Sequence, residues 1–231
     1  MNNLNKTVCL VTGASSGIGK QTAIKISNIA DHVYILSRDV SRLEIVNDHI
    51  INNGADCTIV PMDLTKKNNI KELAKNIYEK ENKIDIVISS AGRINQLSPV
   101  VSQNEDEVIK TFKLNYLSNL LLMKEFLPLL KLSSKGKFIV ISSMYSALKS
   151  QYWSGYQPIM TALNELVRIY AEENKNIRVN CICPSAVDTD FRNDIMPGED
   201  KELILKPEQI AENIIKTIQD DTIQSGEIIS I

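Results

Sequence analysis

The chain alternates short runs of valine and isoleucine with longer segments of helical spacing, and this alternation limits the folds open to it. The strand-like runs are Thr7–Thr12, Val33–Leu36, Cys57–Val60, Asp85–Ile88, Lys137–Ser142, Arg178–Cys183 and Gly226–Ile231. The helical segments between them are, approximately, Gly17–Ala30, Val40–Asn53, Lys66–Lys80, Glu105–Lys131, Tyr152–Asn174 and Pro207–Gln219. Strands joined by helices form a parallel sheet with helices on both faces. Since no linker or repeat interrupts the pattern, residues 1–231 are predicted to form a single α/β domain, a Rossmann-like doubly wound parallel sheet of about seven strands.

Composition excludes several classes of partner. Of the 231 residues 43% are hydrophobic, and the net charge is −2 with no basic run of five residues. We therefore expect neither a nucleic-acid nor a membrane partner. The most apolar stretch, Leu120–Leu132, is interrupted by charged residues and is too short to span a bilayer.

Cysteine and histidine usage indicates a cytoplasmic protein without a metal site. The four cysteines lie in strand-like runs and none forms a Cys-x-x-Cys motif, so we expect reduced, buried thiols. His32 and His49 are isolated in the sequence, and no metal site is predicted. The N-terminus enters a strand directly and lacks the layout of a signal peptide.

A glycine-rich turn, TGASSGIG, follows the first strand and opens the first helix. Gly13 lets the chain turn out of the strand, while Gly17 and Gly19 let backbone approach a phosphate. The N–H groups that begin the helix would then face a pyrophosphate. This position after a strand and before a helix favours dinucleotide binding over a turn of purely structural function.

At this point the sequence resembles the short-chain dehydrogenase/reductase family. TGASSGIG resembles that family's cofactor signature, and SSAG (Ser89–Gly92), LNY (Leu114–Tyr116) and IRVNCICPSAVDT (Ile177–Thr189) follow in the family's order. SSAG departs from the usual Asn-Asn-Ala-Gly, and Ser185 replaces a glycine. The resemblance implies that Asp63 meets the adenine ring and that Thr189 contacts the nicotinamide carboxamide or the phosphates. The cofactor-binding residues that we expect are Gly13, Ser15, Ser16, Gly17, Ile18, Gly19, Arg38, Asp63, Leu64, Ala91, Gly92, Tyr156, Val187 and Thr189.

The residues after the second strand favour NADP(H) over NAD(H). Ser37 stands where an acidic residue would bind the ribose hydroxyls of NAD, and Arg38 follows it. An arginine can hold the 2′-phosphate with a bidentate contact. The alternative is that Arg38 is a surface arginine paired with Asp39 or Glu44. The nearby carboxylate of Asp39 reduces the preference for NADP(H) over NAD(H).

Two tyrosines compete for the catalytic position. Tyr145 begins a Tyr-x-x-x-Lys match that ends at Lys149, whereas Tyr156 is followed at that spacing by Met160. In the family the catalytic serine precedes the tyrosine by a pocket loop, and Ser143 and Tyr156, thirteen residues apart, fit this arrangement. Tyr145 lies too near the end of its strand to stand on the following helix. We therefore expect Tyr156 to be the acid/base, Ser143 to orient the carbonyl, and Asn115 to be the family's helix asparagine.

Met160 stands where the family has a lysine. That lysine binds the nicotinamide ribose and lowers the pKa of the tyrosine, and Met160 can do neither. Alcohol oxidation needs tyrosinate while carbonyl reduction needs neutral tyrosine, so we expect a bias toward reduction with NADPH. Lys149 is an alternative cation that could reach the site. Pro158 is compatible with a helix only if the helix begins close to Tyr156.

The resemblance implies an NAD(P)(H)-dependent oxidoreductase that reduces a small-molecule carbonyl to an alcohol. The alternative is a catalytically impaired family member that binds a dinucleotide as a sensor or partner. Arg192 either holds an anionic substrate or lies in a solvated loop, and Tyr145, Tyr152 and Trp153 are candidates to line the pocket. The family pairs subunits through its long helices, so a homodimer or homotetramer is expected.

Overall fold

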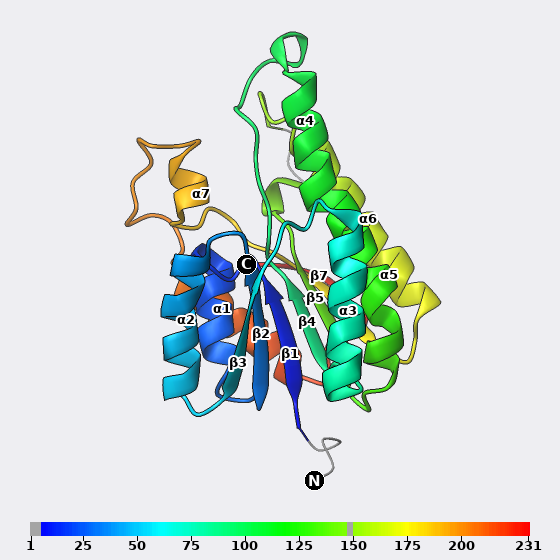
Figure 1. The fold of residues 1–231 in the computed structure, drawn as a ribbon. Helices are drawn as coiled ribbons and strands as arrows, with labels where there is room; N and C mark the ends of the chain where they lie inside the picture. Colours follow the sequence, from blue (N-terminus) through cyan, green and yellow to red (C-terminus); the bar gives the residue numbers. More distant parts are fainter. Residues whose placement is uncertain (1–5, 147–149) are drawn as a thin grey trace.

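The computed structural model describes residues 6–146 and 150–231. Over this part of the chain, seven strands form one parallel sheet in the order β3-β2-β1-β4-β5-β6-β7 (Figure 1). The strands are β1 Val8–Thr12, β2 His32–Ser37, β3 Asp56–Pro61, β4 Ile86–Ser89, β5 Lys137–Ile141, β6 Arg178–Cys183 and β7 Ile228–Ser230. The predicted single Rossmann-like α/β domain is confirmed.

Helices cover both faces of the sheet because strand residues alternate between two cores. In β1, Val8 and Leu10 face one core while Cys9 and Val11 face the other. The first core is closed by α3 (Lys67–Glu81), α5 (Ser118–Lys131) and α6 (Gln157–Glu173), and the second by α1 (Gly17–Ile26), α2 (Val40–Asn52) and α8 (Pro207–Gln219). The remaining elements are η2 Val100–Ser102, α4 Glu105–Phe112, η3 Lys113–Leu117, η4 Met144–Ser146 and α7 Asp190–Asn193.

Two helices differ from the sequence prediction. The long helix expected over Glu105–Lys131 contains a π-helical turn, η3, between α4 and α5. The helix expected from Tyr152 begins instead at Gln157, because Tyr152 has a φ of 72° and residues 152–156 form turns. Pro158 therefore lies in the first turn of α6, where its missing N–H costs no helical hydrogen bond.

The strand order places a topological switch beside β1. β2 pairs with one edge of β1 and β4 with the other, so the connections diverge at the carboxyl ends of β1 and β4. Crevices at this point are the usual ligand sites of doubly wound sheets. In Figure 1, α4 and α7 lie beyond this end of the sheet, on opposite sides of it.

Candidate active site

A cavity of about 830 Å³ lies at the carboxyl ends of the central strands. It brings together all the residues that the sequence analysis expected to bind the cofactor or to form the catalytic set of Asn115, Ser143 and Tyr156. These are Gly13, Ser15, Ser16, Gly17, Ile18, Gly19, Arg38, Asp63, Leu64, Ala91, Gly92, Asn115, Ser143, Tyr156, Val187 and Thr189. Residues from distant parts of the chain thus share one cavity, while the function of each within it stays a prediction.

The glycine turn packs directly against the end of β4. Gly13 has a φ of 66°, and a Cβ there would lie 2.8 Å from the Cα of Ala91. The hydroxyl of Thr12 accepts hydrogen bonds from the N–H groups of Ser90 and Ala91, each at 3.2 Å. These contacts hold the turn and the SSAG segment together as one wall of the cavity.

The first turn of α1 offers N–H groups to this cavity. Ser16 is the N-cap residue of α1, and its side chain makes no capping hydrogen bond. The first N–H groups of the helix are therefore not bonded by the Ser16 side chain. Gly17 has a φ of 52°, and a Cβ there would lie 3.0 Å from the Cγ2 of Thr189. The close backbone and the free helix end form a cradle of the kind that binds phosphate.

Arg38, which directly follows β2, supplies a positive charge to the cavity. Arg38 is exposed there and its charge acts on Asp63. Asp39 is engaged elsewhere, because it accepts a hydrogen bond from the backbone N–H of Arg42 and lies 3.5 Å from the Arg42 guanidinium. The carboxylate nearest to Arg38 in the sequence is therefore partly neutralised by another arginine.

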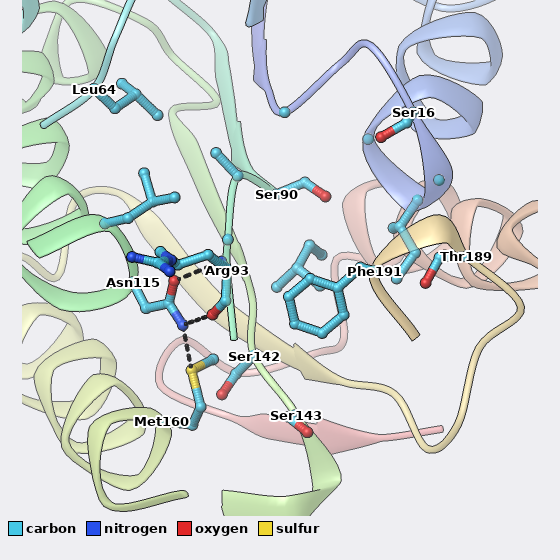
Figure 2. A pocket seen from close by; sticks show the side chains of 18 of the residues that line it. Ser16, Leu64, Ser90, Arg93, Asn115, Ser142, Ser143, Met160, Thr189 and Phe191 are labelled. Atoms are coloured by element: carbon cyan, nitrogen blue, oxygen red, sulfur yellow. Dashed lines mark hydrogen bonds between the residues drawn. The ribbon is translucent and has the colours of Figure 1, made fainter. Parts of the chain in front are cut away.

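Asn115 lies on the π-helical turn and fixes the chain that follows β4. Its side chain accepts a hydrogen bond from the N–H of Arg93 at 2.9 Å and donates one to the carbonyl of Arg93 at 2.8 Å. The same amide group approaches the sulfur of Met160 at 3.5 Å, as Figure 2 shows. Met160, 3% exposed, thus occupies the floor of the cavity one turn after Tyr156.

Asn119 is a site residue that the sequence analysis missed. It lines the cavity, and its amide donates a 2.8 Å hydrogen bond to the backbone carbonyl of Asn115. Its own side-chain oxygen is buried without a hydrogen-bond partner. The available signal was its spacing, because a residue four positions after Asn115 shares its helix face.

Tyr156 and Ser143 form the polar pair of the cavity. The Tyr156 side chain is buried beside Ser143, whose hydroxyl accepts a hydrogen bond from the N–H of Tyr145 at 3.2 Å. Burial raises the pKa of Tyr156, and the nearby Ser143 hydroxyl and the charge of Arg192 offset only part of that rise. The phenol is therefore neutral near pH 7 and is a proton donor rather than a base.

A polar clamp from another loop holds the turn that precedes Tyr156. Gln103 donates hydrogen bonds to the hydroxyl of Ser154 at 3.0 Å and to the carbonyl of Ser98 at 2.9 Å, and it accepts one from Asn95 at 2.7 Å. A Cβ on Gly155 would clash with the side-chain amides of Asn95 and Gln103. The position of Tyr156 therefore depends on a segment some fifty residues earlier in the chain.

The other aromatic candidates from the sequence differ in where they lie relative to the cavity. Tyr145 lies in η4, directly after β5, and its hydroxyl accepts a hydrogen bond from Arg192. Tyr145 and Trp153 line the cavity, whereas Tyr152 is exposed and is not among its lining residues. Lys149, the alternative cation, lies outside the described residues.

Arg192 is buried and paired in the structure. It is 6% exposed, so it does not lie in a solvated loop. Its guanidinium is held by both carboxylate oxygens of Glu199, each at 2.7 Å. The solvated-loop expectation was wrong because this partner carboxylate lies in the same segment of chain and folds back onto Arg192, whereas the pairing opposes an anionic substrate without contradicting it.

Several wider features of the chain can be stated for residues 6–146 and 150–231. All four cysteines are free thiols, three of them buried. No set of three potential metal ligands gathers in this part of the chain. None of its helices combines the length and apolarity that crossing a bilayer requires.

Comparison with known proteins gives a consistent set of relatives. The family model for short chain dehydrogenase matches residues 7–200. An uncharacterized oxidoreductase of Staphylococcus saprophyticus is 31% identical over 225 residues, which cover 95% of this chain and 94% of that protein. A benzil reductase ((S)-benzoin forming) of Saccharomyces cerevisiae is 31% identical over 198 residues, covering 81% and 74% respectively. The crystal structure of a short chain dehydrogenase from Shigella flexneri, complexed with NADP, has a TM-score of 0.90 at 27% identity, covering 99% of this chain and 98% of that one.

Proposed function

Because the chain belongs to the short-chain dehydrogenase family, we propose that it is an NADP(H)-dependent oxidoreductase that reduces a carbonyl to an alcohol. The observation that carries this proposal is that Tyr156 and Ser143 lie together in the same cavity as the glycine turn. The name of the yeast relative, a benzil reductase, supports a carbonyl as the group that is reduced.

The cavity fits a dinucleotide with a 2′-phosphate. The cradle at Gly13 and Gly17 leaves no space for side chains, and the free start of α1 suits a pyrophosphate. Arg38 would hold the 2′-phosphate, and Asp39 opposes it less because Arg42 lies beside it. The NADP in the structure of the Shigella relative supports the same cofactor here. When bound, NADPH supplies the hydride that the chain's own residues cannot provide.

The remaining steps belong to the chain itself. Ser143 would donate a hydrogen bond to the substrate carbonyl, and Tyr156 would give its proton to the developing alkoxide oxygen. We take Met160 to stand at the position of the family's lysine. Without that cation the buried phenol keeps its proton, which supports reduction over alcohol oxidation as the favoured direction.

Two further expectations accompany this proposal. A homo-oligomer would follow from the family's habit of pairing through its long helices, and a cytoplasmic location from the sequence. Both stay predictions.

Loss of NADPH absorbance with a panel of aldehydes and ketones tests the proposal, with wild type beside Tyr156→Phe. The variant is expected to lose about 10²–10⁴-fold in rate, the usual contribution of a positioned acid, while it binds NADPH as tightly as wild type. Tight NADPH binding with no turnover of any carbonyl would contradict the reductase and favour the dinucleotide-binding alternative.

A further inference from the structure

Aromatic rings gather beside Tyr156 in the cavity. Tyr145 and Trp153 stack with ring centroids 4.1 Å apart and an interplanar angle of 6°. Trp153 meets Tyr156 edge-on at 6.0 Å, and Phe191 lies 6.2 Å from Tyr156 on α7. All four rings line the cavity, so a carbonyl placed at Tyr156 would have its substituent among aromatic faces and edges.

These aromatic residues and Arg192 form one wall of the cavity, and the positive charge of Arg192 is already paired. Arg192 gives two 2.7 Å hydrogen bonds to Glu199 and a third, at 3.2 Å, to the hydroxyl of Tyr145. The bond to Arg192 lowers the pKa of Glu199, which keeps the carboxylate charged opposite the guanidinium. The wall that Arg192 completes therefore carries a neutral ion pair rather than a free positive charge.

Resting on the function proposed above, we propose that this wall is a subsite for a neutral aryl ketone or aldehyde, with the aromatic ring next to the carbonyl. Ring–ring contacts contribute beyond the area that they bury, which favours an aryl over a saturated group of equal size. A carboxylate beside the carbonyl would lose its hydration without gaining an unpaired cation from Arg192, which disfavours 2-oxo acids.

Trp153 makes the subsite directly observable. It is the sole tryptophan in the chain and is 5% exposed, so its fluorescence reports this wall and not solvent. Its carbonyl accepts hydrogen bonds from the N–H groups of Tyr156 and Gln157 at the start of α6. Substituting Trp153 would remove the ring that packs against Tyr145 and Tyr156, so ligand titration of the native residue is the better measurement.

The experiment titrates three probes into the protein saturated with NADP⁺, which carries no hydride to transfer. The probes are acetophenone, cyclohexyl methyl ketone with a saturated ring, and benzoylformate with a carboxylate in place of the methyl group. Trp153 quenching is corrected with free N-acetyltryptophanamide. Acetophenone is expected to bind about three- to tenfold more tightly than the saturated ketone and at least about tenfold more tightly than benzoylformate. Equal binding of the two ketones, or tightest binding of benzoylformate, would overturn the subsite.

Glu199→Gln tests the paired charge separately, with Glu202→Gln as the control. Glu202 is an exposed carboxylate in the same segment. Removing the Glu199 charge frees Arg192, so benzoylformate is expected to gain about tenfold in affinity for Glu199→Gln and nothing for the control. An unchanged affinity in a folded Glu199→Gln variant would count against the neutral wall. The wild-type titrations decide the proposal even if this variant fails to fold.

The same probes separate failure of the subsite from failure of the proposed function. Acetophenone that quenches Trp153 as expected but consumes no NADPH would leave the subsite standing and remove the reductase. NADPH consumption with benzoylformate but not with acetophenone would leave the reductase standing and remove the subsite.

Discussion

At the scale of single residues, we expect Met160 to set the direction of the proposed reaction. Met160→Lys would place a cation one helical turn after Tyr156, where it lowers the pKa of the phenol by favouring the phenolate. Each unit of lowering raises the tyrosinate fraction near neutral pH about tenfold. Alcohol oxidation with NADP⁺ at pH 7 is therefore expected to rise at least about tenfold in the variant. The uncharged substitution Met160→Leu is the matched control.

The raised pKa of Tyr156 predicts that the oxidation rate increases with pH. Burial raises the pKa of Tyr156, so in wild type the oxidation rate should climb about tenfold per pH unit across the alkaline range, while reduction stays flat near neutrality. In Met160→Lys the oxidation profile should move to lower pH. Identical profiles for the lysine and leucine variants would show that position 160 does not control the Tyr156 proton.

We expect the choice of cofactor to depend on Arg38. Arg38→Ala is expected to weaken NADPH binding by roughly ten- to a hundredfold, the range for one lost charge-assisted contact, and to leave NADH binding nearly unchanged. Titration of both nucleotides measures this. Arg168→Ala, an exposed arginine on α6 paired with Glu165, is the control. Equal losses for NADPH and NADH would contradict a contact with the 2′-phosphate.

Local signals explain which site residues the sequence could predict. Gly13, Gly17 and Gly19 belong to one short motif, and Ser143 and Tyr156 are joined by a recognisable spacing, so both sets could be placed before the structure was known. Phe191 and Asn119 carry no such motif. The pairing of Arg192 with Glu199 depends on how a loop folds back, which no periodic pattern records.

At the scale of elements, the loop that precedes α6 depends on one glycine. Gly155→Ala would push a methyl group into the amides of Asn95 and Gln103, which hold Ser154 in place. The free energy of unfolding is expected to fall by about 1–3 kcal/mol, as overpacking does elsewhere. Because the same turn positions Tyr156, turnover should fall at least about tenfold.

The control for this substitution is Gly198→Ala. A Cβ at Gly198 meets no atom within 4 Å, so that variant should keep both stability and turnover. Urea unfolding and steady-state kinetics measure the two effects. A Gly155→Ala variant with wild-type kinetics would show that the clamp does not position Tyr156.

Hydrophobic spacing predicted the existence of the strands and main helices but not their interruptions. The π-helical turn at Lys113–Leu117 inserts one extra residue per turn, which leaves the apolar pattern of Glu105–Lys131 nearly continuous. The start of α6 was misplaced because Tyr152 adopts a left-handed conformation that its residue type does not favour. The fold was therefore more predictable than the irregular turns that position Asn115 and Tyr156.

At the scale of the whole molecule, an apolar stripe runs along α4, η3 and α5. Ile109, Phe112 and Leu120 are exposed on it, and the ring of Tyr116 stacks on Phe112 with centroids 5.0 Å apart. Contiguous exposed apolar side chains usually mark an interface. The neighbouring helix α6 exposes Ile169 in addition. We therefore expect a homo-oligomer in which α4, α5 and α6 meet the same helices of a second subunit.

Leu120→Glu tests this assembly. A charge in the stripe would have to be buried without a partner in the oligomer but would stay hydrated in the free subunit, so dissociation is expected. Light scattering after size-exclusion chromatography measures the mass of wild type and variant. Val101→Glu is the control, because Val101 is 95% exposed on η2 and lies off the stripe, so that variant should keep the wild-type mass. A monomeric wild type would contradict the interface, whereas a dissociated Leu120→Glu variant that still binds NADPH would show that each subunit completes its own cofactor site.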